Sequence, residues 1–226
     1  MKKYILGISA FLTLLITGCG KDNYDEPTSI LTGKIVSEAS KQVIGVKNQS
    51  EGGVKIQLWQ DGYELHTSIE VSVNQDGTFS ASLFDGTYKV VTTDNNGPWI
   101  NDRDTVVVQV RGNTTVEYPV RPYFELKNEK FNIEGNTLTA TFDVAQVNAI
   151  QDRGISEVSL YVGNTVFVDD SFNKKKANAT TAATGSNTVT MDISDLSSNA
   201  VLYARVGVKI NGVEQRLYTA GTVRVK

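Results

Sequence analysis

The sequence predicts an all-β protein made of two tandem β-sandwiches that follow an N-terminal export signal. Nearly every segment beyond residue 28 alternates apolar and polar side chains with period two. Gly, Asn and Asp turns separate these segments at intervals of about ten residues, the pattern of a sandwich or barrel. The chain has 226 residues, of which 40% are hydrophobic, which is enough for two ordinary globular cores.

Residues 1–18 have the composition of a cleaved signal peptide. Lys2 and Lys3 form a positive start, and the apolar stretch 5–16 is shorter than the roughly 20 residues that span a bilayer. The Ile-Thr-Gly directly before Cys19 resembles the lipobox of bacterial lipoproteins. This resemblance implies that Cys19 is acylated, and several acyl chains hold a protein stably on a membrane. The alternative is an ordinary secretory signal in which Cys19 is a chance residue.

Residues 19–28 are predicted to form the acylated cysteine and a flexible tether, because the stretch is polar, charged and has no apolar period. Its Lys-Asp start and acidic run resemble the surface-export signal of Bacteroidota lipoproteins. The resemblance implies a lipid-anchored protein of the outer membrane that faces the cell exterior. A plain hydrophilic spacer that faces the periplasm is the alternative.

Residues 29–121 are predicted to form the first sandwich. The expected strands cover residues 33–36, 54–60, 69–73, 79–83, 88–92, 106–110 and 116–120. Asp-Gly-Thr-Phe ending at Phe79, and Gly-Thr-Tyr-Lys-Val beginning at Gly86, resemble the central hairpin of the carboxypeptidase-regulatory-like domain. That domain is a transthyretin-like (prealbumin-like) sandwich without catalytic activity. The resemblance implies that Phe79 and Tyr88 fill the core from adjacent strands.

Residues 122–226 are predicted to form the second sandwich, because Pro122 interrupts the strand pattern. The expected strands cover residues 138–142, 158–162, 166–168, 189–193, 201–208 and 217–225. Leu196 followed by Tyr203 resembles the corner between strands E and F of fibronectin type III domains. This implies an immunoglobulin-like topology in which the Tyr203 hydroxyl bonds back to the corner. The lysine-rich residues 173–176 open a low-complexity stretch that is predicted to be a mobile loop.

Composition and motifs exclude several function classes. A net charge of −3 argues against nucleic acid, and one cysteine with one histidine excludes disulfide frameworks and ordinary zinc sites. Asp102 with Asp104, and Asp169 with Asp170, lack the spacing of a calcium loop, so they are predicted to be solvated turn carboxylates. His66 is interpreted as a solvated residue, and no catalytic motif occurs. We therefore expect no metal, no cofactor and no enzymatic activity.

Exposed aromatic side chains are the candidates for a ligand site, because sugars stack their apolar C–H faces on such rings. Trp59 points away from the apolar side of its strand, and Tyr63 follows it in a turn. Trp99 lies with Asp102 and Arg103 in a long polar loop. The alternatives are that Trp99 plugs the end of the sandwich and that Trp59 packs against the second domain.

The whole chain resembles a two-domain lipoprotein family of Bacteroidota, often encoded beside outer-membrane glycan importers. The resemblance rests on the lipobox, the acidic tether, the Arg-Pro-Tyr junction and the two sandwich patterns. It implies a non-catalytic surface lipoprotein that acts as an accessory or glycan-binding component of a polysaccharide-uptake system. Its expected partners are the membrane, a glycan, and an outer-membrane transporter with its substrate-binding lipoprotein. The alternative is a structural spacer or a pilus-like adhesin subunit.

Overall fold

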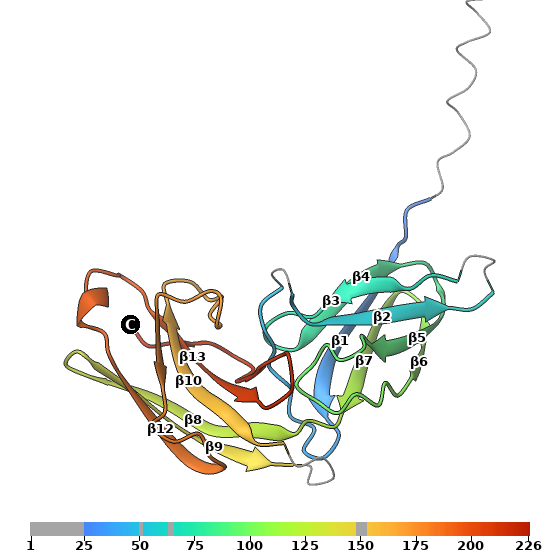
Figure 1. Ribbon diagram of the computed structural model, residues 1–226. Coiled ribbons are helices and arrows are strands. Elements are labelled where there is room, and N and C mark those ends of the chain that lie inside the picture. Colours follow the sequence, from blue (N-terminus) through green and yellow to red (C-terminus); the bar gives the residue numbers. More distant parts are fainter. Residues whose placement is uncertain (1–24, 50–51, 63–65, 148–152) are drawn as a thin grey trace, which may run out of the picture.

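The computed structural model describes residues 25–49, 52–62, 66–147 and 153–226, which form two β-sandwiches in succession (Figure 1). The predicted all-β fold class, with tandem sandwiches, is confirmed. The predicted signal peptide, Cys19 and most of the predicted tether lie outside the described residues. Within the described ranges, no helix is long and apolar enough to cross a membrane.

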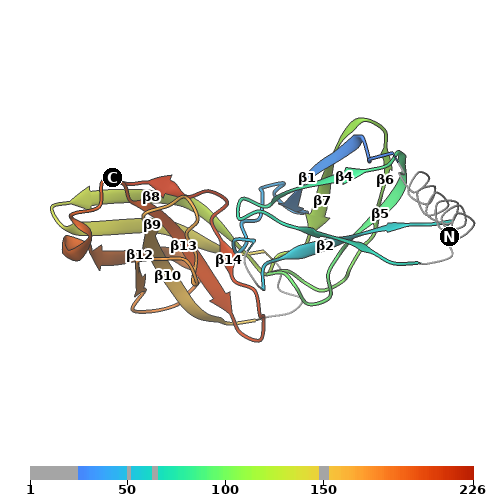
Figure 2. The same cartoon turned by 90° about the horizontal axis from the view of Figure 1, so that it is seen from above.

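The first sandwich consists of a three-stranded sheet, in the order β4-β1-β7, and a four-stranded sheet, in the order β3-β2-β5-β6 (Figure 2). Its strands are β1 (Ser29–Ser37), β2 (Lys55–Gln60), β3 (Ile69–Ser72), β4 (Thr78–Leu83), β5 (Gly86–Thr92), β6 (Val106–Val110) and β7 (Asn113–Val120). Strand β1 is central in its sheet, since it pairs antiparallel with β4 and parallel with β7. Alternation places Leu31 and Ile35 of β1, and Ile56 and Leu58 of β2, in the buried core.

The expected central hairpin is wrong, although its aromatic residues are buried as expected. Strand β4, which carries Phe79, belongs to one sheet, and β5, which carries Tyr88, belongs to the other. The turn at Asp85 and Gly86 therefore crosses between the sheets. The Tyr88 hydroxyl donates to the Phe84 carbonyl oxygen at 3.1 Å, which satisfies a buried polar group at this crossing.

The second sandwich pairs a sheet in the order β12-β9-β8 with a sheet in the order β11-β10-β13-β14, in which β15 also pairs with β13. Its strands are β8 (Phe124–Glu134), β9 (Thr137–Gln146), β10 (Ile155–Gly163), β11 (Lys175–Asn178), β12 (Gly185–Asp192), β13 (Tyr203–Ile210), β14 (Leu217–Tyr218) and β15 (Val223–Arg224). A short 3-10 helix, Ser194–Leu196, lies between β12 and β13. A bulge in β8 places Asn128 at a φ of 57°, which asparagine tolerates.

The Tyr203 hydroxyl does not make the expected bond to the corner backbone among the described residues. Tyr203 is half-buried and packs against a small cluster that contains Tyr161 and Tyr218. A different side chain makes a hydrogen bond to the backbone of this corner: Asn199 Nδ2 donates to the Leu196 carbonyl oxygen at 3.2 Å. A tyrosine hydroxyl is therefore not needed there.

The predicted mobile loop is wrong where the low-complexity stretch forms strand β11 and the start of β12, while residues 179–184 between them lie outside the strands. Residues 175–178 form β11, which pairs with β10. Lys176 Nζ lies 2.7 Å from a Glu157 carboxylate oxygen, and Lys175 Nζ lies 2.7 Å from one of Asp195. Backbone pairing and these ion pairs order a segment whose small side chains bury little surface.

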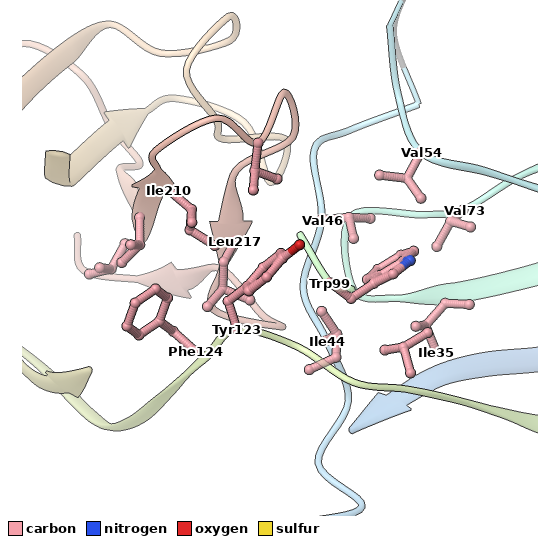
Figure 3. Packing of buried hydrophobic residues seen from close by; sticks show 14 of the residues in the cluster. Ile35, Ile44, Val46, Val54, Val73, Trp99, Tyr123, Phe124, Ile210 and Leu217 are labelled. Carbon is pink, nitrogen blue, oxygen red and sulfur yellow. The ribbon is translucent and has the colours of Figure 1, made fainter. Parts of the chain in front are cut away.

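The two sandwiches share one continuous hydrophobic core. Figure 3 shows Tyr123 between Leu217 of the second sandwich and the residues Trp99 and Ile44 of the first. The backbone is also joined, since the Tyr218 N–H donates to the Gly45 carbonyl oxygen at 3.1 Å. The junction is therefore a packed interface rather than a flexible linker.

A buried arginine adds polar contacts to this interface. Arg205 of β13 is 0% exposed and lies 4.6 Å above the Tyr218 ring. Its guanidinium donates to the carbonyl oxygens of Thr219 at 2.9 Å, Val168 at 3.4 Å and Gln75 at 2.6 Å. Burial lowers the pKa of Arg205 to about 10, so it remains charged at neutral pH.

Asp169 is also part of the interface, so its prediction as a solvated carboxylate is wrong. It is 0% exposed, and its Oδ2 accepts the backbone N–H of Asn48 at 3.0 Å. Asp170 is exposed but accepts the Tyr218 hydroxyl at 2.8 Å. Among the described residues, no group of three or more metal-binding side chains is positioned to hold an ion.

Candidate functional site

Trp59 lies on the outer face of the four-stranded sheet, near the end of β2 that points away from the second sandwich (Figure 1). Its neighbours Ile56 and Leu58 are buried in the core, and Trp59 itself is partly exposed. The His66 ring stacks on it, with the ring centroids 5.3 Å apart and the planes at 29°. Trp59 therefore lies on the solvent side of the sheet, as predicted. The stacked His66 ring adds to the same aromatic surface.

Charged groups lie beside this aromatic pair. Lys89 of β5 is the register partner of Trp59, and its Nζ lies 2.6 Å from Asp61 Oδ2. His66 Nε2 lies 3.4 Å from the other oxygen of Asp61. Hydrogen bonds from Lys89 and from His66 lower the pKa of Asp61, so this exposed carboxylate is an ionised acceptor at neutral pH.

Arg103 extends from a loop onto the same face. Its Nη2 donates to Gln57 Oε1 at 3.0 Å, and its Nε donates to the Thr92 carbonyl oxygen at 3.1 Å. Gln57 is two residues before Trp59, so both side chains project from the same side of β2. The Trp59 face is defined here by six residues: Gln57, Trp59, Asp61, His66, Lys89 and Arg103.

Two further sequence candidates, Trp99 and Asp102, do not join the Trp59 face. Trp99 is 4% exposed and packs on Gly97, where an added Cβ would lie 2.1 Å from its ring. Trp99 is thus a plug at the domain junction, the alternative to a ligand platform. Asp102 is ion-paired with Arg121, with 2.6 Å between Oδ2 and Nη2. Tyr63 lies outside the described residues.

Sequence reasoning missed two exposed phenylalanines in the second sandwich. Phe167 and Phe172 lie in the loop between β10 and β11 and border a cavity of about 270 Å³. Phe167 was interpreted as part of a strand. The sequence does contain a signal for these exposed rings. Phe167 and Phe172 lie five positions apart, and the polar, turn-forming residues Asp-Asp-Ser lie between them.

The Trp59 face is suited to binding. It offers one aromatic surface, an ionised acceptor in Asp61, and donors in Lys89 and Arg103. An ionised, exposed Asp61 cannot donate a proton as a general acid near neutral pH. The same set of groups can take the hydroxyls of a polar ligand while the indole contacts its apolar side.

Two family models match most of the chain. The N-terminal domain of DUF3823, described as a protein of unknown function, matches residues 29–121, and the DUF3823_C domain matches residues 124–222. The chain belongs to the DUF3823 family. No curated protein matches it. The predicted two-domain family of Bacteroidota is confirmed by these matches and by the structures below.

Solved DUF3823 proteins share the whole architecture. A DUF3823 protein of Parabacteroides merdae is 38% identical, with a TM-score of 0.82 over 89% of this chain and 100% of that chain. One of Bacteroides ovatus is 35% identical, with a TM-score of 0.78 over 87% of this chain and 98% of that chain. A Bacteroides uniformis structure described as a "putative carbohydrate binding protein" is 22% identical, with a TM-score of 0.69 over 88% of this chain and 99% of that chain.

Proposed function

We propose that this DUF3823 protein is a non-catalytic lipoprotein of the outer cell surface and a glycan-binding accessory component of a polysaccharide-uptake system. The lipobox-like residues before Cys19 and the acidic tether support the anchoring. The Trp59 face carries the binding part of the proposal. It combines a partly exposed indole with a carboxylate, an ammonium and a guanidinium group on one sheet.

The chemistry of the Trp59 face favours a carbohydrate ligand. The indole of Trp59 supplies a flat apolar surface for sugar C–H groups. Asp61 accepts hydrogen bonds from hydroxyls, and Lys89 donates to their oxygens. Asp61 and Lys89 are paired at 2.6 Å, and the Arg103 guanidinium, which donates to the neutral Gln57 side chain, adds a positive donor to the face. The description of the Bacteroides uniformis protein agrees with this proposal, although at 22% identity that protein supports only the fold.

Affinity electrophoresis of the full-length chain on gels with and without polysaccharide tests the proposal. The gels would contain, in turn, a β-glucan, an arabinan, a pectin or chondroitin sulfate. We expect retardation by at least one, and Trp59→Ala should weaken it about two- to tenfold, since an aromatic contact contributes about 0.5–1.5 kcal/mol. Phe84→Ala removes another exposed ring of the same domain and serves as the control. An unretarded wild type would refute glycan binding.

The membrane anchor is tested separately. Incorporation of labelled palmitate should occur in the wild type and be lost in Cys19→Ala, and externally added protease should degrade the protein on intact cells. Labelling that persists in Cys19→Ala would refute the assigned anchor. Cross-linking in whole cells tests the proposed contact with an outer-membrane transporter.

The alternative of a pilus-like subunit requires a strand that one copy donates to the sheet of another. Strand β1 pairs with β4 on one side and β7 on the other, so its removal would split a sheet. Filaments, or ladders on unboiled gels, would favour this alternative over the glycan-binding component.

A further inference from the structure

The loop between β10 and β11 exposes apolar side chains. We call residues 164–174 the aromatic loop. In this loop, Phe167 is 51% exposed and Phe172 is 46% exposed. Val166 of the same loop is exposed as well. The loop leaves the end of β10 on the side of the second sandwich where the two domains meet (Figure 1). Clustered exposed apolar residues on a soluble domain commonly mark a binding site.

Buried polar contacts hold the loop in one conformation. Oδ1 of the fully buried Asp169 accepts the backbone N–H groups of Ser171 and Phe172, each at 2.8 Å. Oδ2 of the same carboxylate accepts the Asn48 N–H of the first sandwich. The backbone position of Phe172 is therefore fixed directly by Asp169, and through it by both sandwiches.

Two further donors hold the other arm of the loop. Gln75 Nε2 of the first sandwich donates to the Val166 carbonyl oxygen at 2.7 Å. Arg205 donates to the Val168 carbonyl oxygen on the other side of Phe167. The exposed rings thus sit on a backbone that is ordered before any ligand arrives, which reduces the entropy cost of binding.

Both phenylalanines line a cavity of about 270 Å³. Its lining consists of Gly163, Asn164, Thr165, Phe167, Ser171, Phe172, Asn173 and Lys174. No carboxylate belongs to this lining. Within the described part of the chain, the side chains of Asn164 and Ser171 make no hydrogen bond, and the Lys174 ammonium group has no ion pair. The lining therefore combines amide, hydroxyl and ammonium donors with two apolar rings.

We infer that the aromatic loop forms a second saccharide-binding site, which takes one sugar unit of a glycan chain. Phe167 and Phe172 would contact the C–H faces of the ring, while Asn164, Ser171 and Lys174 would donate to its oxygens. A purely apolar groove would suit a protein segment, but the lining of this cavity includes the polar side chains of Asn164, Ser171 and Lys174. The inference rests on the proposed glycan-binding function and adds a site in the second domain.

The test measures affinity for the best polysaccharide of the four-member panel by isothermal titration calorimetry, with the full-length chain. Phe167→Ala with Phe172→Ala should weaken binding about tenfold or more, because two aromatic contacts are lost. Asn164→Ala should weaken it about threefold, as expected for one neutral hydrogen bond. Phe84→Ala is the matched control, since it removes a phenylalanine of equal exposure outside the loop. Thermal melting verifies that each variant is folded.

The outcomes separate this inference from the proposed function. If the wild type binds a polysaccharide and the double Phe variant binds it equally well, the loop site is refuted and the proposed function stands. If the double variant loses affinity while Trp59→Ala does not, the loop is the binding site and the Trp59 face is not. If the wild type binds none of the four polysaccharides, the proposed function fails, and the loop inference fails with it.

Discussion

At the scale of single residues, Glu157 of β10 shows how local partners set a charge. Lys176 Nζ lies 2.7 Å from its Oε1 and Arg216 Nη1 lies 2.6 Å from the same oxygen. Ser159 Oγ also donates to it at 2.9 Å. Burial alone would raise the pKa of Glu157, but the hydrogen bonds from Lys176 and Ser159 and the charge of Arg216 outweigh it and lower the pKa to about 2.

This lowered pKa predicts an acid-sensitive contribution to stability. The contribution is fully present above the unfolded-state pKa of 4.5 and is lost as pH falls from there through about 2, because the folded state then has to take up the proton. Glu157→Gln should lower the melting temperature at pH 7 and flatten its decline between pH 4.5 and 2. Glu129→Gln, at an exposed position of β8, is the control. Equal acid dependence in the wild type and Glu157→Gln would contradict this prediction.

Alternation along a strand identified the outward direction of Trp59, but it could not decide the environment of residues in loops. The sequence left a ligand platform and a plug as alternatives for Trp99, and its packing against Gly97 and within the shared core shows that it is a plug. Asp169 looked like a solvated turn residue because its hydrogen-bond partner, Asn48, is 121 positions away. Such contacts between distant segments leave no local sequence pattern.

At the scale of elements, the turn between β3 and β4 depends on one glycine. Gly77 has a φ of +78°, and its N–H donates to the Asn74 carbonyl oxygen at 2.8 Å. A Cβ at this position would lie 2.5 Å from the Ile44 carbonyl oxygen. The turn therefore requires glycine at position 77 for two reasons: the positive φ of its backbone and the close approach of the segment at Ile44.

Gly77→Ala should destabilise the protein by about 2–4 kcal/mol, which adds the cost of a left-handed alanine to that of a steric clash. Gly112→Ala is a matched control, because Gly112 also has a positive φ, +58°, but no atom lies within 4 Å of the added Cβ. It should cost only about 1 kcal/mol. Urea denaturation measures both free energies of unfolding, and equal losses would show that the clash with Ile44 is relieved at no cost.

Strand positions were predictable from alternation, whereas sheet membership was not. The segments around Phe79 and Tyr88 are strands as predicted, yet they belong to different sheets, because a two-residue turn can either close a hairpin or cross a sandwich. Strand β11 was missed because Lys175–Asn178 has no apolar alternation and is ordered by pairing with β10. The alternation of apolar and polar residues shows which face of a strand is buried, but it does not show which strand lies beside it.

At the scale of the whole molecule, the shared core and the polar contacts at the junction make the two sandwiches one mechanical unit. The aromatic loop is held from the first sandwich through Asn48 and Gln75. The Trp59 face lies on the outer side of that same sandwich. The two proposed sugar contacts are therefore kept at a fixed separation, which favours one extended glycan over two independent ligands.

Arg205 is predicted to hold this unit together, because its guanidinium joins the carbonyl oxygen of Gln75 in one sandwich to those of Val168 and Thr219 in the other. Arg205→Met keeps much of the volume but leaves these acceptors without their donor, so it should cost about 2 kcal/mol or more. Arg224→Met is the control, since Arg224 is exposed at the edge strand β15.

Hydrogen exchange distinguishes loss of coupling between the sandwiches from a general loss of stability. If Arg205 joins the sandwiches, Arg205→Met should raise exchange first at the amides on the two sides of the junction, those of Asn48 and Tyr218, whose acceptors lie in the opposite sandwich. Amides in the centre of β9 should keep their protection, because β9 pairs with β8 and β12 inside its own sheet. Equal acceleration at β9 and at the junction would mean that Arg205 stabilises its own domain and that the shared apolar core alone couples the pair.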